Sequence, residues 1–365
     1  MTVMTPRRLM IMAAGTGGHI FPGLAIADAM QQRGWVVTWL GTAHGMEGEL
    51  VAKYRIPMDV LHFSGMRGKG WRHSLAGAVK LVAGLWRCFQ FLGARKPDVV
   101  LGMGGYVTVP GGLMAKLRGI PLVLINADAA LLLSNRFLVS CAKKVLFGFP
   151  ADFGAAAGKA RVTGNPVRKE ITTLPGPAVR YGQRTGPLNL LIVGGSLGAK
   201  VLNETLPLAL ALMPVALRPV VTHQSGKQHI AALQAAYKKA QVSADVVAFI
   251  DDMPVRYAKA DLVICRSGAI TVSELTAAGV ASVLVPFMAS STTHQKNNAD
   301  WMADQKAAIH LSQQEMTAEK LAAILTALSR KECQKLAEAA YQLGRRNANQ
   351  DIADVLEEMT QRTAG

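Results

Sequence analysis

The amino-acid sequence predicts an α/β fold made of two domains, each with a doubly wound parallel sheet. Short apolar segments, followed by glycines and then by a helix-like stretch, recur along the 365 residues. Strands that alternate with helices in this way are typical of parallel sheets covered by helices on both faces. A chain of this length also favours two domains. The series is interrupted at residues 172–188, where three prolines and three glycines suit a linker.

The first half of the chain contains the first series of elements. Residues 9–14 form a predicted buried strand, a glycine turn follows at 15–18, and an amphipathic helix then runs to Gly34. Further strands are expected at residues 35–41, 98–102, 121–126 and 143–149. The strand at 98–102 is again followed by glycines and a helix, which repeats the βαβ plan.

The second half restates this architecture without close sequence repetition. Its strands are expected at residues 189–193, 218–223, 245–250, 261–265 and 282–287. The first of them leads into a glycine loop at residues 194–198. Open parallel sheets bind ligands beyond the carboxyl ends of their strands. We therefore expect the two domains to face each other across a substrate cleft.

Composition limits the classes of function. The chain has 40 Lys and Arg against 24 Asp and Glu, and its net charge of +16 favours a polyanionic partner: nucleic acid, anionic lipid or a phosphorylated substrate. Aromatic residues make up only 6% and no nucleic-acid-binding signature occurs, so nucleic acid is not expected. The four cysteines are widely spaced, which argues against disulfides and zinc, and no apolar stretch reaches 18 residues. A cytosolic protein in a reducing compartment is expected.

Three glycine loops follow predicted strands, at residues 15–18, 102–105 and 194–198. Glycine lets the backbone approach a phosphate, although it can also serve only to make the turn. The first loop reads G-T-G-G, not G-x-G-x-x-G, and the second strand ends in Gly41-Thr42 without a carboxylate for a dinucleotide ribose. No P-loop motif occurs either. A nucleotide sugar or another phosphate ligand remains.

Residues 265–274, with the sequence CRSGAITVSE, form the most specific stretch. A strand and a glycine turn precede a helix whose N-terminus suits a diphosphate. Glu274 lies about one turn into that helix, where its carboxylate could accept hydrogen bonds from both hydroxyls of a ribose. A glutamate at this place also complements the helix dipole without any ligand.

Eight segments follow one another along nearly the whole chain: AAGTGGHIFPGLA, SGMRGKG, KPDVVLGMGGYV, GNPVR, GGSLGA, HQSGK, FIDDM and CRSGAITVSE. In this order they resemble the bacterial MurG family, the N-acetylglucosaminyltransferases of peptidoglycan synthesis and hence of cell-wall biogenesis, cell shape and cell division. The resemblance implies the GT-B fold. It further implies an acceptor- and membrane-associating domain at residues 1–165, a UDP-GlcNAc-binding domain at 166–345 and a last helix, 346–365, that crosses back to the first domain.

The reaction implied by this resemblance moves GlcNAc from UDP-GlcNAc to the 4-hydroxyl of MurNAc in undecaprenyl-pyrophosphoryl-MurNAc-pentapeptide (lipid I), which yields lipid II. An α-linked donor and a β-linked product imply one displacement with inversion, with a base for the acceptor and charge stabilisation for the leaving UDP. Glycosyltransferases of the other main fold hold the diphosphate with a metal bound to a D-x-D motif, and no two Asp in this chain have that spacing. Neither a metal nor another cofactor is expected. The expected location is the cytoplasmic face of the bacterial inner membrane, with other cell-wall synthesis proteins as further expected partners.

The family motifs, matched residue by residue, imply roles for particular side chains. His19 is the expected base, since the pKa of an unperturbed histidine lies near neutrality. The expected donor-binding residues are Thr16, Gly17, Gly18, Asp128, Arg168, Ser196, Ile250, Ala269, Ile270, Thr271, Val272, Ser273, Glu274 and Gln295. Among them, the Ile250 backbone would meet the uracil, Ala269–Thr271 the diphosphate, Glu274 the ribose and Gln295 the GlcNAc hydroxyls. The expected acceptor-binding residues are Gly104, Gly105, Tyr106 and Asn126.

One segment departs from the family pattern. Many members carry His-Glu-Gln-Asn where this chain has Ile125-Asn126-Ala127-Asp128. Asn126 thus replaces the family's Glu and Asp128 its Asn, so a carboxylate expected beside the acceptor has moved by two positions or been lost. The alternatives to the MurG transferase are a GT-B transferase with a different acceptor, a catalytically impaired homologue and a basic, non-enzymatic scaffold.

A basic apolar helix is predicted within residues 67–96, which contain seven Lys or Arg and no acid. One helical stripe consists of Leu75, Val79, Val82, Trp86 and Phe89, and a second apolar stripe lies beside it. Two stripes are wider than docking on the protein requires, which favours an interfacial helix on anionic lipid. The expected membrane-contacting residues are Leu75, Val79, Lys80, Trp86, Arg87 and Phe89. A helix buried on both sides is the alternative.

Overall fold

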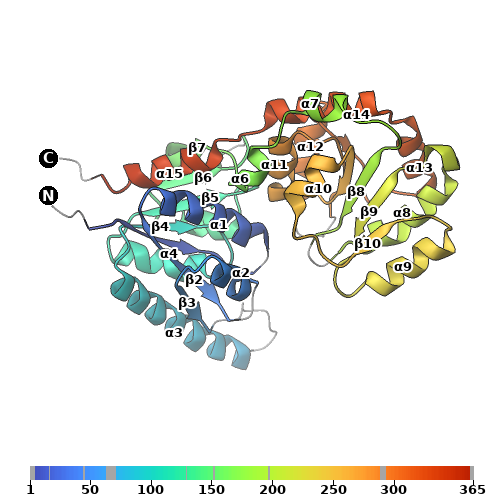
Figure 1. The fold of residues 1–365 in the computed structure, drawn as a ribbon. Coiled ribbons are helices and arrows are strands. Elements are labelled where there is room, and N and C mark those ends of the chain that lie inside the picture. The colour runs from blue at the N-terminus through green and yellow to red at the C-terminus, as the bar shows by residue number, and fades with distance from the viewer. Residues whose placement is uncertain are drawn as a thin grey trace. The chain divides into compact units, whose positions relative to one another are not determined.

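The computed structural model describes residues 5–15, 17–43, 46–62, 71–128, 130–150, 153–195, 198–287 and 293–361, with the backbone alone for 71–81. The chain forms two compact units (Figure 1). Unit 1 consists of Met1–Arg168 and Asn347–Gly365, and unit 2 of Lys169–Arg346. Each unit is a parallel sheet with helices around it, so the predicted class of two doubly wound α/β domains is confirmed.

Unit 1 contains a seven-stranded parallel sheet with the order β3-β2-β1-β4-β5-β6-β7. The strands are β1 (Arg8–Met12), β2 (Val36–Thr42), β3 (Met58–Leu61), β4 (Val99–Gly102), β5 (Leu122–Asn126), β6 (Lys144–Phe147) and β7 (Ala160–Val162). The strand order reverses between β1 and β4, and such a switch point is where doubly wound sheets bind ligands.

Helices cover both faces of this sheet. They are α1 (Gly17–Gln32), α2 (Glu47–Lys53), α3 (Trp71–Arg95), α4 (Thr108–Leu117), α5 (Leu133–Leu138) and α15 (Ala348–Glu358), together with the 3-10 turn η1 (Gly154–Lys159). Side chains alternate along β1, so Leu9 and Ile11 pack with α1 and α15, whereas Met10 and Met12 pack with α3, α4 and α5. The sheet therefore separates two apolar cores.

Helix α15 belongs to unit 1 although it comes last in the chain. Ile352, Val355 and Leu356 are fully buried in the same core as α1, and Arg33 on the other side of the contact pairs with Asp354 at 2.7 Å. This contact explains why α1 lacks the expected amphipathic pattern. Packed between the sheet and α15, it is buried on most of its surface.

Unit 2 contains a six-stranded parallel sheet with the order β10-β9-β8-β11-β12-β13. The strands are β8 (Asn189–Val193), β9 (Val220–Gln224), β10 (Asp245–Val247), β11 (Leu262–Cys265), β12 (Ser282–Leu284) and β13 (Ile309–His310). Its switch point lies between β8 and β11. The predicted strands at 245–250 and 282–287 end early, so Ile250 and Phe287 lie in the segments that follow the sheet.

The helical segments of unit 2 are α6 (Lys169–Thr172), α7 (Pro177–Gly182), α8 (Lys200–Leu212), η2 (Val215–Leu217), α9 (Ile230–Lys239), α10 (Met253–Lys259), α11 (Ala269–Ala278), α12 (His294–Asp304), α13 (Ala318–Ala327) and α14 (Arg330–Leu343). Helices α8 and α13 pack together, as do α11 and α14. Their Leu202, Leu206 and Leu321 side chains are fully buried in the unit 2 core. Among the described residues, no helix is long and apolar enough to span a bilayer.

Candidate active site

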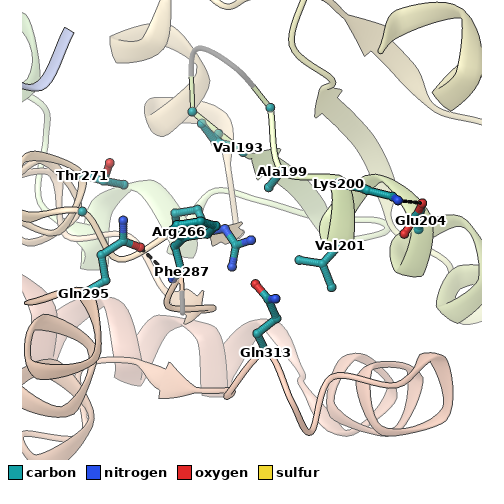
Figure 2. Close-up of a pocket in the computed structure, with 14 residues that line it drawn as sticks. Val193, Ala199, Lys200, Val201, Glu204, Arg266, Thr271, Phe287, Gln295 and Gln313 are labelled. Atoms are coloured by element: carbon teal, nitrogen blue, oxygen red, sulfur yellow. Dashed lines mark hydrogen bonds and ion pairs between the residues drawn. The ribbon is translucent and has the colours of Figure 1, made fainter. Parts of the chain in front are cut away.

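Unit 2 has a pocket of about 700 Å³ at the switch point of its sheet (Figure 2). Two strand-to-helix connections form it, one running from β8 to α8 and the other from β11 to α11. Its lining residues are Val193, Gly194, Gly195, Gly198, Ala199, Lys200, Val201, Glu204, Arg266, Gly268, Thr271, Phe287, Gln295 and Gln313. The glycine loop and the CRSGAITVSE stretch therefore meet at one site.

The glycines of the first connection are required by close packing. A Cβ atom on Gly194 would lie 2.3 Å from the backbone nitrogen of Ala199. At Gly198, φ is +78° and a Cβ atom would lie 2.0 Å from the carbonyl oxygen of Ser225. Larger residues at these two positions would displace the loop, so the glycines give the pocket its shape.

Two helix N-termini open into this pocket. Helix α8 begins after Ala199 and helix α11 after Gly268, and neither has a side-chain cap. The N–H groups of a helix's first turn have no partner within the helix and carry the positive end of its dipole. A pair of uncapped N-termini around one pocket is suited to a diphosphate. Ala269, Ile270 and Thr271, where contacts to a diphosphate are expected, form the first turn of α11, and Thr271 lines the pocket.

The side of the pocket opposite the glycine loop is formed by polar and aromatic residues. The Arg266 guanidinium donates to the carbonyls of Val285 and Pro286, both at 3.1 Å, and lies 5.3 Å from the Phe287 ring. Burial lowers the pKa of Arg266, although the group remains a cation at neutral pH. Gln295 Oε1 accepts the Phe287 N–H at 2.9 Å, as Figure 2 shows, which leaves the amide nitrogen to donate. Both residues thus offer donors at the pocket.

The remaining residues of the predicted α11 segment lie deeper. Val272 is fully buried and its N–H donates to the Gly268 carbonyl at 3.0 Å, so it presents no group to a ligand. Ser273 is also buried, at 7% exposure. Glu274 retains 9% exposure, and its Oε2 accepts a hydrogen bond from the Tyr257 hydroxyl at 3.2 Å. Neither Ser273 nor Glu274 lines the pocket.

A buried amide connects two parts of this site. Gln224, at the end of β9, donates from Nε2 to the Gly195 carbonyl at 2.7 Å and accepts the Ile250 N–H at Oε1, at 3.1 Å. The Ile250 N–H, which belongs to the backbone expected to meet the uracil, is therefore used within unit 2. The sequence did not single out Gln224, Arg266, Phe287, Gln313 or Tyr257. Gln224 stands in the HQSGK motif, whose presence alone indicated no role.

In unit 1, the loops that follow β1 and β4 meet at the other switch point. His19 lies in the first turn of α1 and is half-buried. A Cβ atom on Gly104 would lie 3.0 Å from His19 Cε1, and φ at Gly104 is +100°. At Gly105, where φ is +81°, a Cβ atom would lie 3.0 Å from the Ala14 carbonyl oxygen. Gly104 and Gly105 thus bring the second loop against the histidine and the first loop.

The environment of His19 favours the neutral imidazole. Burial lowers its pKa below the ordinary value, while the charge of Asp128 and the Met103 backbone oppose that shift. The net direction is downward. A histidine that is neutral at neutral pH can accept a proton, which is what a general base must do. His19 Nδ1 has no hydrogen-bond partner among the described residues.

Asn126 organises the segment that departs from the family pattern. It is fully buried at the end of β5 and donates to the carbonyls of Asp128 and Ala130, at 2.9 and 3.0 Å. Its Oδ1 accepts from the Leu132 N–H at 2.8 Å and from Asn135 Nδ2 at 3.2 Å. All four hydrogen-bonding positions of the amide are therefore used inside unit 1. A glutamate could not donate to the two carbonyls.

The other predicted site residues are placed as follows. Tyr106 is half-buried against the α3–α5 core, and the Arg168 guanidinium lies 5.2 Å from the Phe21 ring, within unit 1. Gly17 and Gly18 begin α1, whereas Thr16 and Ser196 lie outside the described residues. On α3, Trp86 and Arg87 are exposed, and Phe89 is half-buried under the Arg118 guanidinium. Leu75, Val79 and Lys80 belong to α3, but their side chains lie outside the described part.

Two parallel-sheet units, one of them with a pocket at its switch point, are typical of glycosyltransferases of the GT-B class. The N-terminal domain model of glycosyltransferase family 28 matches residues 9–147, and the C-terminal domain model matches residues 189–356. Within this class the chain belongs to the MurG family.

Named relatives support this assignment over nearly the full length. The UDP-N-acetylglucosamine–N-acetylmuramyl-(pentapeptide) pyrophosphoryl-undecaprenol N-acetylglucosamine transferase of Janthinobacterium sp. (strain Marseille) is 66% identical over 98% of this chain and 100% of its own. The enzyme of the same name from Chromobacterium violaceum is 54% identical, with 98% and 99% covered. The crystal structure of Acinetobacter baumannii MurG is 38% identical, has a TM-score of 0.80 and matches 97% of this chain and 100% of its own.

Proposed function

We propose that this protein transfers GlcNAc from UDP-GlcNAc to the 4-hydroxyl of MurNAc in lipid I and so makes lipid II. The relatives that are similar over nearly the whole chain are named for this transfer. The observation that carries the proposal is the unit 2 pocket, where two uncapped helix N-termini and Arg266 converge on one space. Its volume of about 700 Å³ suits a nucleotide sugar.

Unit 2 is the proposed donor-binding unit. The N–H groups of Ala269, Ile270 and Thr271 hold the diphosphate, the Ile250 carbonyl meets the uracil, and Glu274 binds the ribose. When the bond from C1 of GlcNAc to the diphosphate breaks, negative charge grows on the leaving UDP. The helix N-termini already point at that charge and stabilise it without a metal. Gln295 donates to a GlcNAc hydroxyl from its amide nitrogen.

Unit 1 is the proposed acceptor-binding unit. Neutral His19 accepts the proton of the MurNAc 4-hydroxyl while that oxygen attacks C1 from the face opposite UDP, which inverts the configuration. The nearby negative charge of Asp128 stabilises the imidazolium that forms. The departure at Asn126 and Asp128 therefore still leaves one carboxylate that acts on the base.

The experiment that tests this function combines radiolabelled UDP-GlcNAc with a short-chain lipid I analogue, with and without EDTA. We expect a disaccharide product whose rate of formation is unchanged by EDTA. Transfer with the same efficiency from a UDP-hexose that lacks the acetamido group would contradict the donor assignment. UDP-GlcNAc binding without transfer would instead support an impaired homologue or a different acceptor.

We also propose that unit 1 docks on the anionic cytoplasmic surface of the bacterial inner membrane. On α3, Cys88 and Leu92 are buried in the unit 1 core, while Val82 and Trp86 remain 65% and 61% exposed. The described part of α3 thus packs Cys88 and Leu92 on the protein, while Val82 and Trp86 of the first stripe face outward. Helix α4 packs against α3, and α5 packs against α4. These two helices add Leu117, Leu133 and Phe137, each at least 68% exposed. Apolar side chains among exposed basic residues suit a lipid surface.

A further inference from the structure

Gln224 lies at the carboxyl end of β9, beside Val193 at the end of β8. The side chain is only 2% exposed, and its amide bonds to two backbone segments that are not adjacent in the chain. One segment is the glycine loop that follows β8, and the other is the turn that contains Ile250. Gln224 itself does not line the pocket.

The first hydrogen bond fixes the glycine loop. The Gly195 carbonyl accepts the Gln224 Nε2–H at 2.7 Å and also the Gly198 N–H at 3.0 Å. Gly195 has φ of +86° and lines the pocket. The orientation of its peptide groups therefore determines the shape of the pocket on the side of the glycine loop. Two donors therefore bind this carbonyl and fix its orientation.

The second hydrogen bond fixes the turn after β10. Gln224 Oε1 accepts the Ile250 N–H at 3.1 Å, and Ile250 is 5% exposed. This bond holds the peptide group that precedes the Ile250 side chain, and the Ile250 carbonyl belongs to the next peptide group along the chain. The single planar amide of Gln224 therefore connects the glycine loop with the Ile250 backbone, which we assign to the uracil.

We infer that Gln224 is a positioning residue that couples these two segments, so that the nucleoside and the diphosphate of one nucleotide ligand bind as a unit. The inference rests on the proposed function, because it assigns UDP to the unit 2 pocket. The Gln224 amide supplies both the donor and the acceptor that this arrangement uses. Leaving a buried polar group without its partner costs more free energy than an ordinary hydrogen bond contributes. The arrangement of the two segments therefore depends on Gln224.

Two substitutions separate the two connections. Gln224→Glu keeps an acceptor for the Ile250 N–H but cannot donate to the Gly195 carbonyl and places a carboxylate against it. Gln224→Met has similar length and makes neither bond. Isothermal titration of the full-length protein with uridine and with UDP measures each side. We expect the affinity of Gln224→Glu for uridine to stay within about threefold of that of the unaltered protein. Its affinity for UDP should fall about tenfold, which corresponds to the loss of one buried hydrogen bond. Gln224→Met should weaken both.

Tyr181→Phe is the matched control. The Tyr181 hydroxyl donates to the Asp261 carbonyl at 2.7 Å and accepts the Ala281 N–H at 3.3 Å, so it too bridges two backbone segments of unit 2. It is 2% exposed and lies at the amino ends of β11 and β12, away from the pocket. We expect Tyr181→Phe to lower the melting temperature and to leave the ratio of UDP to uridine affinity unchanged.

The outcomes distinguish the inference from the function on which it rests. If Gln224→Glu lowers the melting temperature as Tyr181→Phe does but keeps the ratio of UDP to uridine affinity of the unaltered protein, the positioning role is overturned and the donor assignment stands. If the unaltered protein does not bind UDP, the proposed function fails and the inference fails with it. Should Gln224→Met not fold, Gln224→Glu, which retains one of the two bonds, decides the question.

Discussion

The carboxylate of Glu47 accepts a hydrogen bond from the backbone N–H of Gly15, at 3.2 Å. Glu47 begins α2 and has no solvent exposure, and its other oxygen accepts from the N–H and the hydroxyl of Thr42 at 2.9 and 2.5 Å. One buried side chain thus connects the end of β2 with the first glycine loop. Gln224 makes the corresponding connection in unit 2. In each unit, a buried polar side chain near the end of the second strand fixes the glycine loop after the first.

Replacing Glu47 should destabilise unit 1. Glu47→Ala leaves the N–H groups of Gly15 and Thr42 without their acceptor, and we expect a loss of about 3 kcal/mol in the free energy of unfolding. Glu47→Gln keeps one acceptor oxygen and should lose less. Urea denaturation measures both, with Glu49→Ala as the control because Glu49 is exposed on the same helix. Equal losses for Glu47→Ala and Glu49→Ala would contradict the role.

His19→Ala should lower turnover by roughly 10²–10⁴-fold, the usual contribution of a general base, with little change in donor affinity. Since burial lowers the pKa of His19, the acidic limb of kcat/KM should lie below about pH 6.5. The negative charge of Asp128 raises that pKa, so Asp128→Asn should move the limb further toward acid.

The pH profile of Asp128→Asn, measured from pH 5 to 8, is best compared with that of Asp28→Asn. Asp28 lies on the same helix as His19, so its replacement removes an equal charge farther from the imidazole. A limb that moves toward alkaline pH in Asp128→Asn, or equally in both variants, would show that Asp128 does not act on the base.

Glu274→Ala should weaken UDP-GlcNAc binding, because hydrogen bonds from ribose hydroxyls to a carboxylate are each worth roughly 1.5–3 kcal/mol. Glu274→Gln should be milder, since one acceptor oxygen remains. Tyr257→Phe removes the donor that orients Glu274 and should have a smaller effect than Glu274→Ala. Titration with UDP-GlcNAc gives the dissociation constants, and Glu338→Ala on the exposed face of α14 is the control. A change of less than threefold in Glu274→Ala would exclude the ribose contact.

Reversing Arg87 and Lys116 to Glu should weaken binding to vesicles that contain anionic phospholipid. Both side chains are exposed, on α3 and α4, and each basic residue near such a surface contributes about 1 kcal/mol. Added salt should reproduce part of the loss. Co-sedimentation measures it, and reversing Lys238 and Lys239 on α9 of unit 2 gives the same charge change elsewhere. Transfer to a soluble short-chain acceptor should persist, and unchanged vesicle binding would refute the membrane assignment.

His223 should make unit 2 sensitive to acid. Burial lowers its pKa to about 3, and its Nδ1 lies 2.9 Å from the Tyr237 hydroxyl. The unfolded chain takes up a proton near pH 6.5 while the folded chain does not, so stability is complete above that pH and falls as the pH is lowered toward 3. The loss at pH 5 is about 2 kcal/mol.

The neutral variant His223→Gln should therefore flatten the dependence of the melting temperature on pH between 7 and 5. His310→Gln exchanges a half-buried histidine of the same unit and serves as the control. Parallel curves for His223→Gln and the unaltered protein would show that another group causes the acid sensitivity.

The sequence predicted the long buried strands because they combine continuous apolar runs with glycine turns. It did not predict β3, β7 or β13, which are short and lie at or near sheet edges, where an apolar run is not required. Arg161, in the middle of β7, illustrates this, since its side chain pairs with Glu358 rather than packing in a core. The amphipathic pattern expected for α1 failed for the opposite reason, because α15 buries its second side.

The candidate site was predicted best where a residue offers backbone groups from a glycine turn or a helix N-terminus. Gly195, Gly198, Gly268 and Thr271 line the pocket as that reasoning implies. Gln224 and Glu47 were missed because their role depends on which distant backbone groups the fold places beside them. Asn126 shows the same limit. Its alignment with a family glutamate suggested an acceptor contact, whereas the folded chain surrounds it with carbonyl oxygens and N–H donors that no local pattern specifies.

The position of α15 in the core of unit 1 has a consequence for folding during synthesis on the ribosome. Translation delivers α1 early but α15 only after all of residues 169–346, which at the usual bacterial rate takes on the order of ten seconds. Throughout that interval Ile352, Val355 and Leu356, which cover α1 in the folded protein, are not yet available. The core of unit 1 therefore stays incomplete while unit 2 is synthesised. A nascent chain that stalls before α15 keeps an exposed apolar face on α1, which chaperones and proteases can recognise.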